Sequence, residues 1–304
     1  MTLGIKIYSS EEEIICNKMR FLKDCTSCKK SERCFVLREQ LEFYKYLGIQ
    51  NIEKKFNDII LSQKIGIPDS LKIKNNKKRI DRSWNYQGKN TKIFTHGFHT
   101  YPAMMIPQIA GRLIDMFAKE RDVVLDPFCG SGSVLVEAKL RGLKCYGIDI
   151  NPLARLIAKV KTTPIKVEYL REKFKKFLKN YEKEKDKEII CPSFFNIDFW
   201  FKPKVIYELA VIKKLIDKIE DNNVKDFFKV VFSETVRDVS NTRNDEFKLY
   251  RISKEELENF NPDVLSTFIE KTERNISGME SFLKNCKKLD SPVIILDEDT
   301  RYKT

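Results

Sequence analysis

Two acidic residues and a pair of glycines form the pattern in this sequence that is best suited to binding a ligand. Asp126 ends the apolar run Val123–Leu125, and Gly130 and Gly132 follow shortly after it. A glycine turn that joins a strand to a helix lets a ligand approach the backbone, because no Cβ obstructs it, and leaves amide groups free for a polar partner. The pattern predicts a pocket at the carboxyl end of the strand. An ordinary tight turn is the alternative.

Asp149 is the second acid, and it lies 23 positions after Asp126 at the end of another apolar run. At a spacing of about 20 residues, the acid that ends the second strand of a nucleotide-binding unit accepts hydrogen bonds from ribose hydroxyl groups. We therefore predict that Asp149 binds a ribose, with a solvated strand end as the alternative. The glycines do not follow the Gly-x-Gly-x-x-Gly spacing, which makes a dinucleotide the less favoured ligand.

Strands and helices alternate around these residues. Apolar runs and helical periodicity predict strands at 122–128 and 144–150 and helices at 102–120, 132–142 and 151–161. Because such alternation is typical of parallel strands joined by helical crossovers, we predict an α/β fold. A further short strand, Val293–Leu296, is followed by acidic residues.

The chain divides into five predicted parts. These are a Cys-cluster N-terminal region, a basic linker or arm, a cofactor-binding α/β core, a helical insert and the last core strand, at residues 1–60, 61–92, 93–164, 165–288 and 289–304. The insert is far longer than an ordinary crossover loop, so it is predicted to form a helical subdomain. An apolar face is formed by Val205, Leu209, Ile212, Ile216 and Ile219. Ser253 and Glu256 have the spacing of a capping box, and Asn261-Pro262 predicts a helix start.

The composition is strongly basic. Lysine plus arginine outnumber aspartate plus glutamate by 57 to 44, which gives a net charge of +13. A field of this sign attracts polyanions, so nucleic acid is the expected partner, with improved solubility as the alternative explanation. No apolar run reaches the roughly 18 to 20 residues that span a bilayer, and the N-terminus does not resemble a signal peptide. We expect a cytoplasmic protein without membrane contact.

Four cysteines lie close together near the N-terminus: Cys16, Cys25, Cys28 and Cys34. In the cytosol, cysteines are more often thiols or metal ligands than disulfides. A Cys-x-x-Cys pair chelates one metal readily, so the four thiolates are predicted to hold zinc or an iron–sulfur cluster. The spacing matches no zinc finger that we can name, and Cys16 and Cys34 equally fit a helix core, which leaves a metal-free region as the alternative.

Three segments carry motifs in the order of one enzyme family. They are DPFCGSG at 126–132, GIDINP at 147–152 and FHTYPAMMIPQIAGRLID at 98–115. They resemble the glycine motif, the acidic motif and the cofactor-closing segment of the S-adenosylmethionine-dependent amino-methyltransferases of DNA. The resemblance implies a partial Rossmann-like methyltransferase sheet that binds S-adenosylmethionine.

The resemblance also implies which residues contact the cofactor. They are Tyr101, Pro102, Asp126, Pro127, Phe128, Gly130, Ser131, Gly132, Asp149, Ile150 and Asn151. In the family an acid of the third strand lies near the adenine amino group, and in the segment LDEDTR this is Asp299, or with less support Asp297.

The family's catalytic motif is missing. These enzymes seat the target amine against an Asp, Asn or Ser that is followed by Pro-Pro and an aromatic residue. The sequence has ten prolines but no Pro-Pro pair, so we predict no catalytic residue on this chain. We expect the cofactor-binding part of a methyltransferase, whose other part is a complementing subunit or was lost through frameshift or truncation. An unpaired edge of the sheet would receive such a partner chain.

The insert contains a stretch with residues suited to nucleic acid. In the segment 232–251, the candidates are Arg237, Asn241, Arg243 and Arg251, since arginine and asparagine are suited to phosphate and base-edge contacts. The segment is similar to one found in a subset of the same enzymes. A solvated helix end with a polar loop is the alternative.

The resemblance and the basic charge together favour a site-specific DNA methyltransferase of a restriction-modification system. Such an enzyme modifies adenine N6 or cytosine N4 after the base leaves the duplex. A second hypothesis is an RNA guanosine N2-methyltransferase, whose glycine motif is similar, but the first 90 residues contain no recognisable RNA-binding domain. A third is a non-catalytic nucleic-acid-binding remnant that keeps its affinity for the cofactor.

Overall fold

The computed structural model of the chain describes residues 6–8, 81–243 and 249–300. These residues fall into two compact units, of which one contains Asp81–Asn85 and the other contains the remainder. In the first, the short 3₁₀ helix η2 (Arg82–Trp84) is capped by Asp81, whose carboxylate accepts a 2.9 Å hydrogen bond from the Ser83 amide. The sheet, the helical insert and all predicted cofactor residues belong to the other unit.

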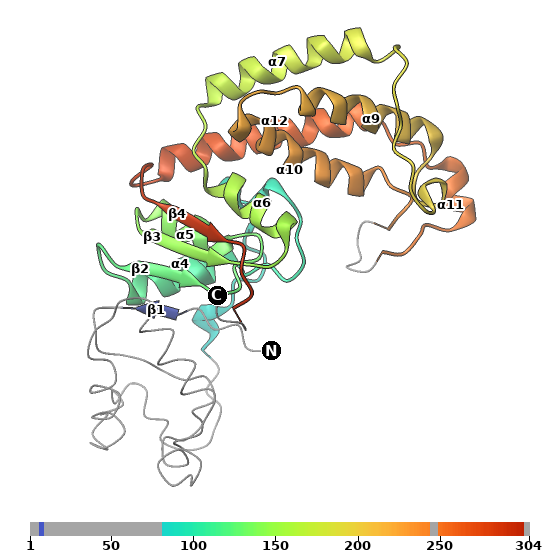
Figure 1. Ribbon diagram of the computed structural model, residues 1–304. Helices are drawn as coiled ribbons and strands as arrows, with labels where there is room; N and C mark the ends of the chain where they lie inside the picture. The colour runs from blue at the N-terminus through green and yellow to red at the C-terminus, as the bar shows by residue number, and fades with distance from the viewer. Residues whose placement is uncertain (1–5, 9–80, 244–248, 301–304) are drawn as a thin grey trace, which may run out of the picture. The chain divides into compact units, whose positions relative to one another are not determined.

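Four strands form one sheet in the order β1-β2-β3-β4 (Figure 1). β2 (Val123–Asp126), β3 (Lys144–Ile148) and β4 (Val293–Leu296) are parallel to one another, and β1 (Lys6–Tyr8) pairs with β2 in the antiparallel direction. The predicted α/β fold class, a partial Rossmann-like sheet with a helical insert, is therefore confirmed. β1 was not predicted, because three residues are too few to show an alternating pattern.

The two edges of the parallel strands differ. β1 pairs with the edge that β2 presents, whereas the outer edge of β4 has no partner strand among the described residues. The docking of a complementing chain at an unpaired edge stays a prediction. Unpaired strand edges present free backbone donors and acceptors to another chain.

Three helices pack beside the sheet: α4 (Pro107–Phe117), α5 (Ser133–Leu140) and α6 (Pro152–Thr162). Val124 lies opposite Cys145, and Cys145 lies opposite Val293, so the three side chains share one face of the sheet. They pack in one apolar cluster with Leu135 of α5. A right-handed crossover from β2 through α5 to β3 puts the helix on this face.

The predicted helix 102–120 was wrong at its beginning. The structure begins α4 at Pro107, with Ile106 in an extended conformation before it. A residue that precedes proline is disfavoured in the helical region, and proline is favoured at the first helical position. Residues 101–106 are consequently free to form a separate turn.

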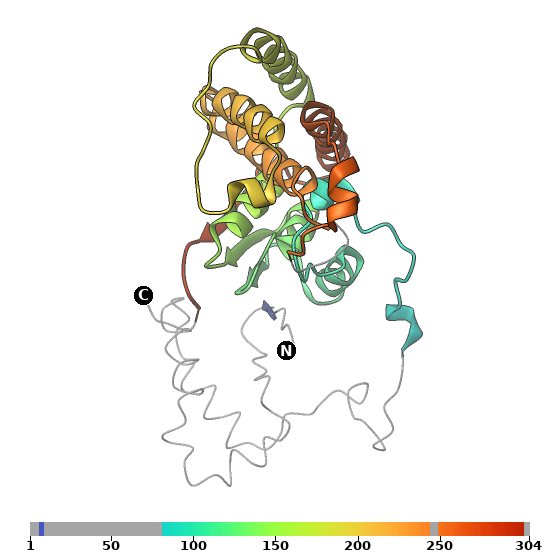
Figure 2. The same cartoon turned by 90° about the vertical axis from the view of Figure 1, so that its right-hand side faces the viewer.

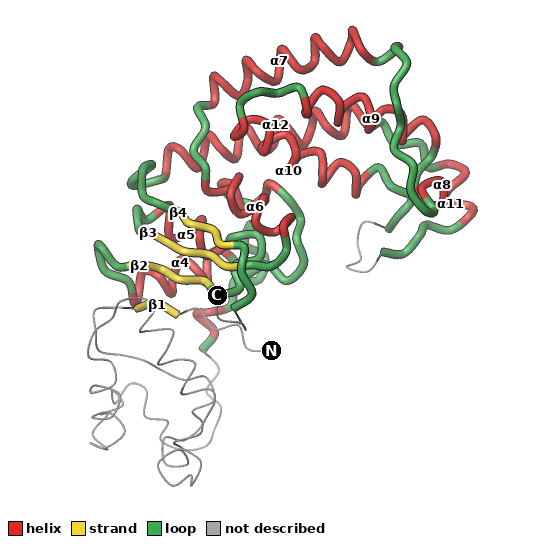
Figure 3. Tube along the Cα trace, viewed as in Figure 1, coloured by secondary structure: helices red, strands yellow, loops and turns green. Residues whose placement is uncertain are grey.

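The insert is helical, as predicted (Figure 3). Its helices are α7 (Val167–Glu184), α8 (Ile197–Trp200), α9 (Pro203–Asp217), α10 (Asn222–Asp238), α11 (Lys254–Asn259) and α12 (Val264–Asn285). The long helices α7, α9, α10 and α12 lie side by side in both views of the ribbon (Figure 2). The Phe177 ring stacks on Phe228 and Phe268, with centroids 5.5 and 5.2 Å apart, and so joins three of these helices.

Local sequence signals in the insert are confirmed. The predicted apolar face of α9 is buried from Val205 to Ile216, and the capping box of Ser253 and Glu256 begins α11. α12 begins shortly after Asn261-Pro262, with Asp263 as its capping residue. No helix in the described part of the chain has the length and apolarity that a membrane crossing requires.

The 3₁₀ helix η3 (Phe94–Phe98) packs between α12 of the insert and the helices α5 and α6 of the α/β core. The Asn275 side chain of α12 donates a 3.1 Å hydrogen bond to the Phe98 carbonyl. Gly278 of α12 lies so close that a Cβ there would overlap the Phe94 carbonyl and come within 2.9 Å of the Phe98 ring. The insert therefore fixes the segment that leads into Tyr101.

We predict that Gly278→Ala lowers the free energy of unfolding by about 1–3 kcal/mol, because the new methyl group must displace backbone at η3. Ser277→Ala, at the exposed neighbouring position of the same helix, serves as the control. Chemical denaturation of both variants tests the prediction. Equal stability of the two would contradict the close contact.

Candidate functional site

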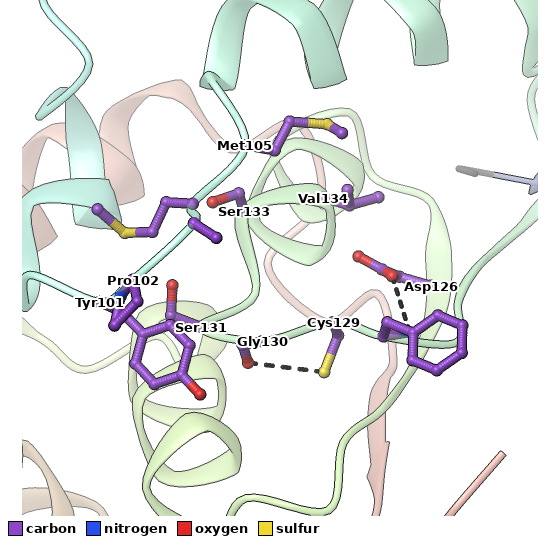
Figure 4. Close-up of a pocket in the computed structure, with 12 residues that line it drawn as sticks. Tyr101, Pro102, Met105, Asp126, Cys129, Gly130, Ser131, Ser133 and Val134 are labelled. Carbon is purple, nitrogen blue, oxygen red and sulfur yellow. Dashed lines mark hydrogen bonds between the residues drawn. The ribbon is translucent and has the colours of Figure 1, made fainter. Parts of the chain in front are cut away.

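A cavity of about 60 Å³ lies at the carboxyl end of β2 (Figure 4). It is lined by Tyr101, Pro102, Ala103, Met104, Met105, Asp126, Phe128, Cys129, Gly130, Ser131, Ser133 and Val134. The glycine motif and the segment that precedes α4 thus meet around one space, as the sequence predicts for a pocket beyond a strand end.

The glycine turn has the backbone that only glycine adopts without strain. Gly130 and Gly132 have φ values of +49° and +81°. A Cβ at Gly132 would also lie 2.8 Å from the Cβ of Ala158 on α6. Both glycines are therefore required for the turn, which opens α5 and brings α6 against it.

Asp149 connects the pieces of this edge of the sheet. Its Oδ2 accepts a 2.9 Å hydrogen bond from the Gly130 amide, and its Oδ1 accepts one of 2.8 Å from the Asn151 amide. The Asn151 side chain in turn donates a 3.1 Å hydrogen bond to the Tyr101 hydroxyl. Each carboxylate oxygen can accept a further hydrogen bond, so the pair can still bind two hydroxyl groups.

Asp126 is nearly buried, with 8% of its surface exposed. Its Oδ1 accepts a 3.1 Å hydrogen bond from the Phe128 amide. Burial raises the pKa of Asp126 to about 6, and the nearby negative charge of Asp149 adds to this effect. A cationic group in the cavity would stabilise the ionised carboxylate.

The segment Tyr101–Met105 closes the cavity from the α4 side. Ala103 has a φ of +54°, a left-handed conformation that strains a residue with a Cβ. The enclosed 60 Å³ is far below the roughly 300–1,000 Å³ of small-molecule sites, so it accommodates only one end of a larger ligand. Phe128 and Ile150, each 62% exposed, provide apolar surface for the remainder outside the cavity.

The acids after β4 have different surroundings. Asp297, the less favoured candidate, forms a 2.7 Å ion pair with Arg155. Arg155 also donates a 2.8 Å hydrogen bond to the Asp149 carbonyl, which ties β4 to the carboxyl end of β3. Asp299 is partly buried, and its role near the adenine stays a prediction.

The predicted nucleic-acid residues gather at the α8 end of the insert. Asn241 is buried, and its side chain donates a 3.2 Å hydrogen bond to the Phe199 carbonyl. Arg251 stacks on the Phe199 ring at 4.1 Å. Arg237 donates a 3.3 Å hydrogen bond to the carbonyl of Arg243. The buried Asn241 side chain therefore supports the backbone at this end of the insert.

The predicted metal ligands Cys16, Cys25, Cys28 and Cys34 lie outside the described residues. Within residues 81–243 and 249–300, no group of three or more His, Cys, Asp or Glu side chains could hold a metal ion.

Sequence reasoning missed several residues that line or support the cavity. Ser133 and Val134 directly follow the glycine motif, and Met104 and Met105 were placed in a helix that begins only later. Lys161 of α6, which contacts Ser131, also went unnoticed. The proline at 107 was the signal that could have separated the methionines from the helix.

Comparison with known proteins identifies the family. A family model described as DNA methylase matches residues 8–160, and one described as D12 class N6 adenine-specific DNA methyltransferase matches residues 107–279, which is more than half of the chain. The chain belongs to the DNA amino-methyltransferases. The resemblance of the three motifs is thereby confirmed.

Relatives of the chain include proteins named as Type II methyltransferases and as tRNA methyltransferases. It is 40% identical over 241 residues to Type II methyltransferase M.MvaI of Kocuria varians, which covers 74% of this chain and 53% of that protein. It is 36% identical over 106 residues to Type II methyltransferase M.MjaII of Methanocaldococcus jannaschii, over 31% of this chain and 20% of that protein.

A tRNA (guanine(10)-N2)-dimethyltransferase of Methanocaldococcus jannaschii is 36% identical over 126 residues, over 36% of this chain and 35% of that protein. The chain thus spans about half of M.MvaI and a smaller share of the other two. No solved structure matches the chain.

The residues present fit S-adenosylmethionine, the methyl donor of this family. The free lone pairs of Asp149 suit ribose hydroxyls, and Gly130, which lines the cavity without a Cβ, lets a ligand approach the backbone of the turn. The buried carboxylate of Asp126 suits the ammonium of an amino-acid end.

We predict that Asp126→Asn stabilises the fold above pH 6. The folded pKa of about 6 lies above the ordinary 3.8, so the folded state binds the proton more tightly, and stability is lost as the pH rises through this window. The neutral amide removes a cost of up to about 3 kcal/mol at pH 7.5, and little at pH 4. Thermal unfolding across pH measures the difference.

The control for this prediction is Asp186→Asn, which removes the same charge from an exposed position. A pH profile of Asp126→Asn that parallels the unmodified protein would contradict the assigned burial of the charge.

Proposed function

We propose that this chain binds S-adenosylmethionine and forms the cofactor-binding part of a site-specific DNA methyltransferase that modifies an exocyclic base amine. The observation that carries the proposal is the hydrogen bonding of Asp149, which joins the glycine turn, the start of α6 and, through Asn151, the Tyr101 hydroxyl. This geometry leaves acceptors for a ribose beside a cavity suited to an amino-acid end.

The chain's residues have distinct parts in the proposed mechanism. When bound, the cofactor supplies a methyl group activated by its sulfonium. Asp149 would accept hydrogen bonds from the ribose, Phe128 and Ile150 would offer apolar surface to the adenine, and Asp299 would accept a hydrogen bond from its amino group. Asp126 would hold the ammonium, and Tyr101 with the following turn would keep water from the cavity.

The proposed substrate is DNA, with adenine N6 or cytosine N4 as the target amine. The match to M.MvaI covers 74% of this chain, whereas the match to the tRNA enzyme covers 36%, which favours DNA over RNA guanosine N2. The Type II names of the relatives support a place in a restriction-modification system.

We also propose that methyl transfer needs residues beyond these 304. The sequence has no Pro-Pro pair to seat the amine, and M.MvaI is matched over only 53% of its length. One face of the sheet supports the proposal that further residues complete the fold. On this face Leu125, Tyr146 and Ile294 lie side by side in register and are only partly buried. Such a face suits packing by a complementing chain or segment.

The cofactor proposal is tested by calorimetry with S-adenosylmethionine. We expect the unmodified chain to bind and Asp149→Asn to weaken binding by about 10- to 100-fold, since hydrogen bonds to a charged acceptor contribute about 1.5–3 kcal/mol. Asp198→Asn, an exposed change of the same type, should bind normally. No binding by the unmodified chain would overturn the proposal.

The nucleic-acid proposal is tested with Arg243→Ala in a salt series. If Arg243 contacts a phosphate, duplex DNA binding should weaken across sequences, and the slope of log affinity against log salt should fall by about one. Lys176→Ala on α7 removes the same charge from an exposed position. An effect equal to that of Lys176→Ala would remove Arg243 from the interface, and tighter binding of RNA than DNA would favour the alternative substrate.

A further inference from the structure

Lys161 is a fully buried lysine in the last turn of α6. Its Nζ lies 3.5 Å from the Ser131 hydroxyl, and among the described residues it makes no ion pair within 4 Å. A buried ammonium without a carboxylate is costly, and buried charges are normally paired. The position therefore calls for an anionic partner.

The neighbouring acid is already engaged. Glu234 of α10 is the carboxylate that acts most strongly on Lys161, but it forms an ion pair with Arg274 and accepts hydrogen bonds from the Thr100 amide and hydroxyl. Lys271 of α12 lies 3.6 Å from the same carboxylate. Lys271 forms its closer ion pair with Asp238, so Arg274 is the main partner of Glu234. Lys161 makes no ion pair with either acid, and its hydrogen bond is to Ser131.

The other titratable groups nearby add no negative charge. His96 and His99, in and after η3, both have pKa values lowered by burial, so they are neutral at pH 7. Burial lowers the pKa of Lys161 to about 8, with Glu234 opposing the shift, so the amine is still mainly protonated at pH 7. A carboxylate near Ser131 would compensate the positive charge of Lys161.

Ser131 connects Lys161 to the cavity. It belongs to the glycine turn and lines the cavity, and the adjacent Gly132 packs against Ala158, one turn before Lys161 on α6. In Figure 4, Ser131 lies beside Tyr101 and Pro102, whereas Asp126 lies on the other side of the pocket. The cavity thus has the Asp126 carboxylate at one side and, at the other, the Ser131 hydroxyl, which contacts the Lys161 ammonium.

We propose that Ser131 and Lys161 form the subsite for the carboxylate of the ligand's amino-acid end. Lys161 donates to the Ser131 oxygen, which directs the hydroxyl proton into the cavity, where it donates to the carboxylate. Lys161 is then a positioning residue that acts through Ser131. The inference rests on the proposed binding of S-adenosylmethionine, and it adds the group that distinguishes this ligand from one without a carboxylate.

The test compares two ligands that differ only in the carboxylate: S-adenosylmethionine and its decarboxylated analogue. Calorimetry at pH 7 measures both with the unmodified chain and with Lys161→Met, which keeps the length of the side chain and removes its charge. We expect the variant to lose about tenfold in affinity for S-adenosylmethionine and less than about twofold for the analogue, because only the former makes the charge-assisted contact. The preference for the carboxylate should largely disappear.

Each outcome decides the question. An equal loss for both ligands would mean that Lys161 only supports the fold, and no loss for either would mean that it does not sense the carboxylate; both results overturn the inference. If Lys161→Met unfolds, Ser131→Ala provides the same comparison of ligands. Failure of the unmodified chain to bind either ligand, or 5′-methylthioadenosine, would instead remove the proposed function and this inference with it.

Discussion

The carboxylate of Asp149 is the interaction on which the carboxyl edge of the sheet depends. One of its oxygens accepts a hydrogen bond from the Gly130 amide, in the turn after β2. The other accepts a hydrogen bond from the Asn151 amide, at the start of α6. An acid at the end of β3 therefore fixes the conformation of two segments at once. The Asn151 side chain then donates a hydrogen bond to the Tyr101 hydroxyl, so the glycine turn and the Tyr101 side of the cavity are joined by one set of hydrogen bonds.

A second network joins the helical insert to the same cavity. Glu234 of α10 binds Thr100, which precedes Tyr101, and its other oxygen pairs with Arg274 of α12. Removing one partner of a buried pair is costly, so the insert and the closing segment are fixed together. Asp126 and Lys161 are buried charges that weaken the fold, and such groups are typical of sites that bind charged ligands.

Much of the fold was predictable from sequence, because its signals are local. The glycine spacing specifies a left-handed turn that other residues adopt only with strain. The capping box of Ser253 and Glu256 satisfies its own helix end, and the apolar face of α9 repeats at the helical period. The position of Asp149 after an apolar run was likewise sufficient to predict where it would lie. None of these features needs a distant contact.

The sequence by itself determined the methyltransferase motifs, the presence of parallel strands joined by helical crossovers and the helical character of the insert. Only the tertiary structure decided that Asn241 is buried under α8, that Lys161 reaches the glycine turn and that Glu234 holds Thr100. These contacts join residues from 30 to more than 130 positions apart. The burial of a side chain and the compensation of its charge depend on such distant neighbours. A local pattern of residue types does not predict which neighbours these are.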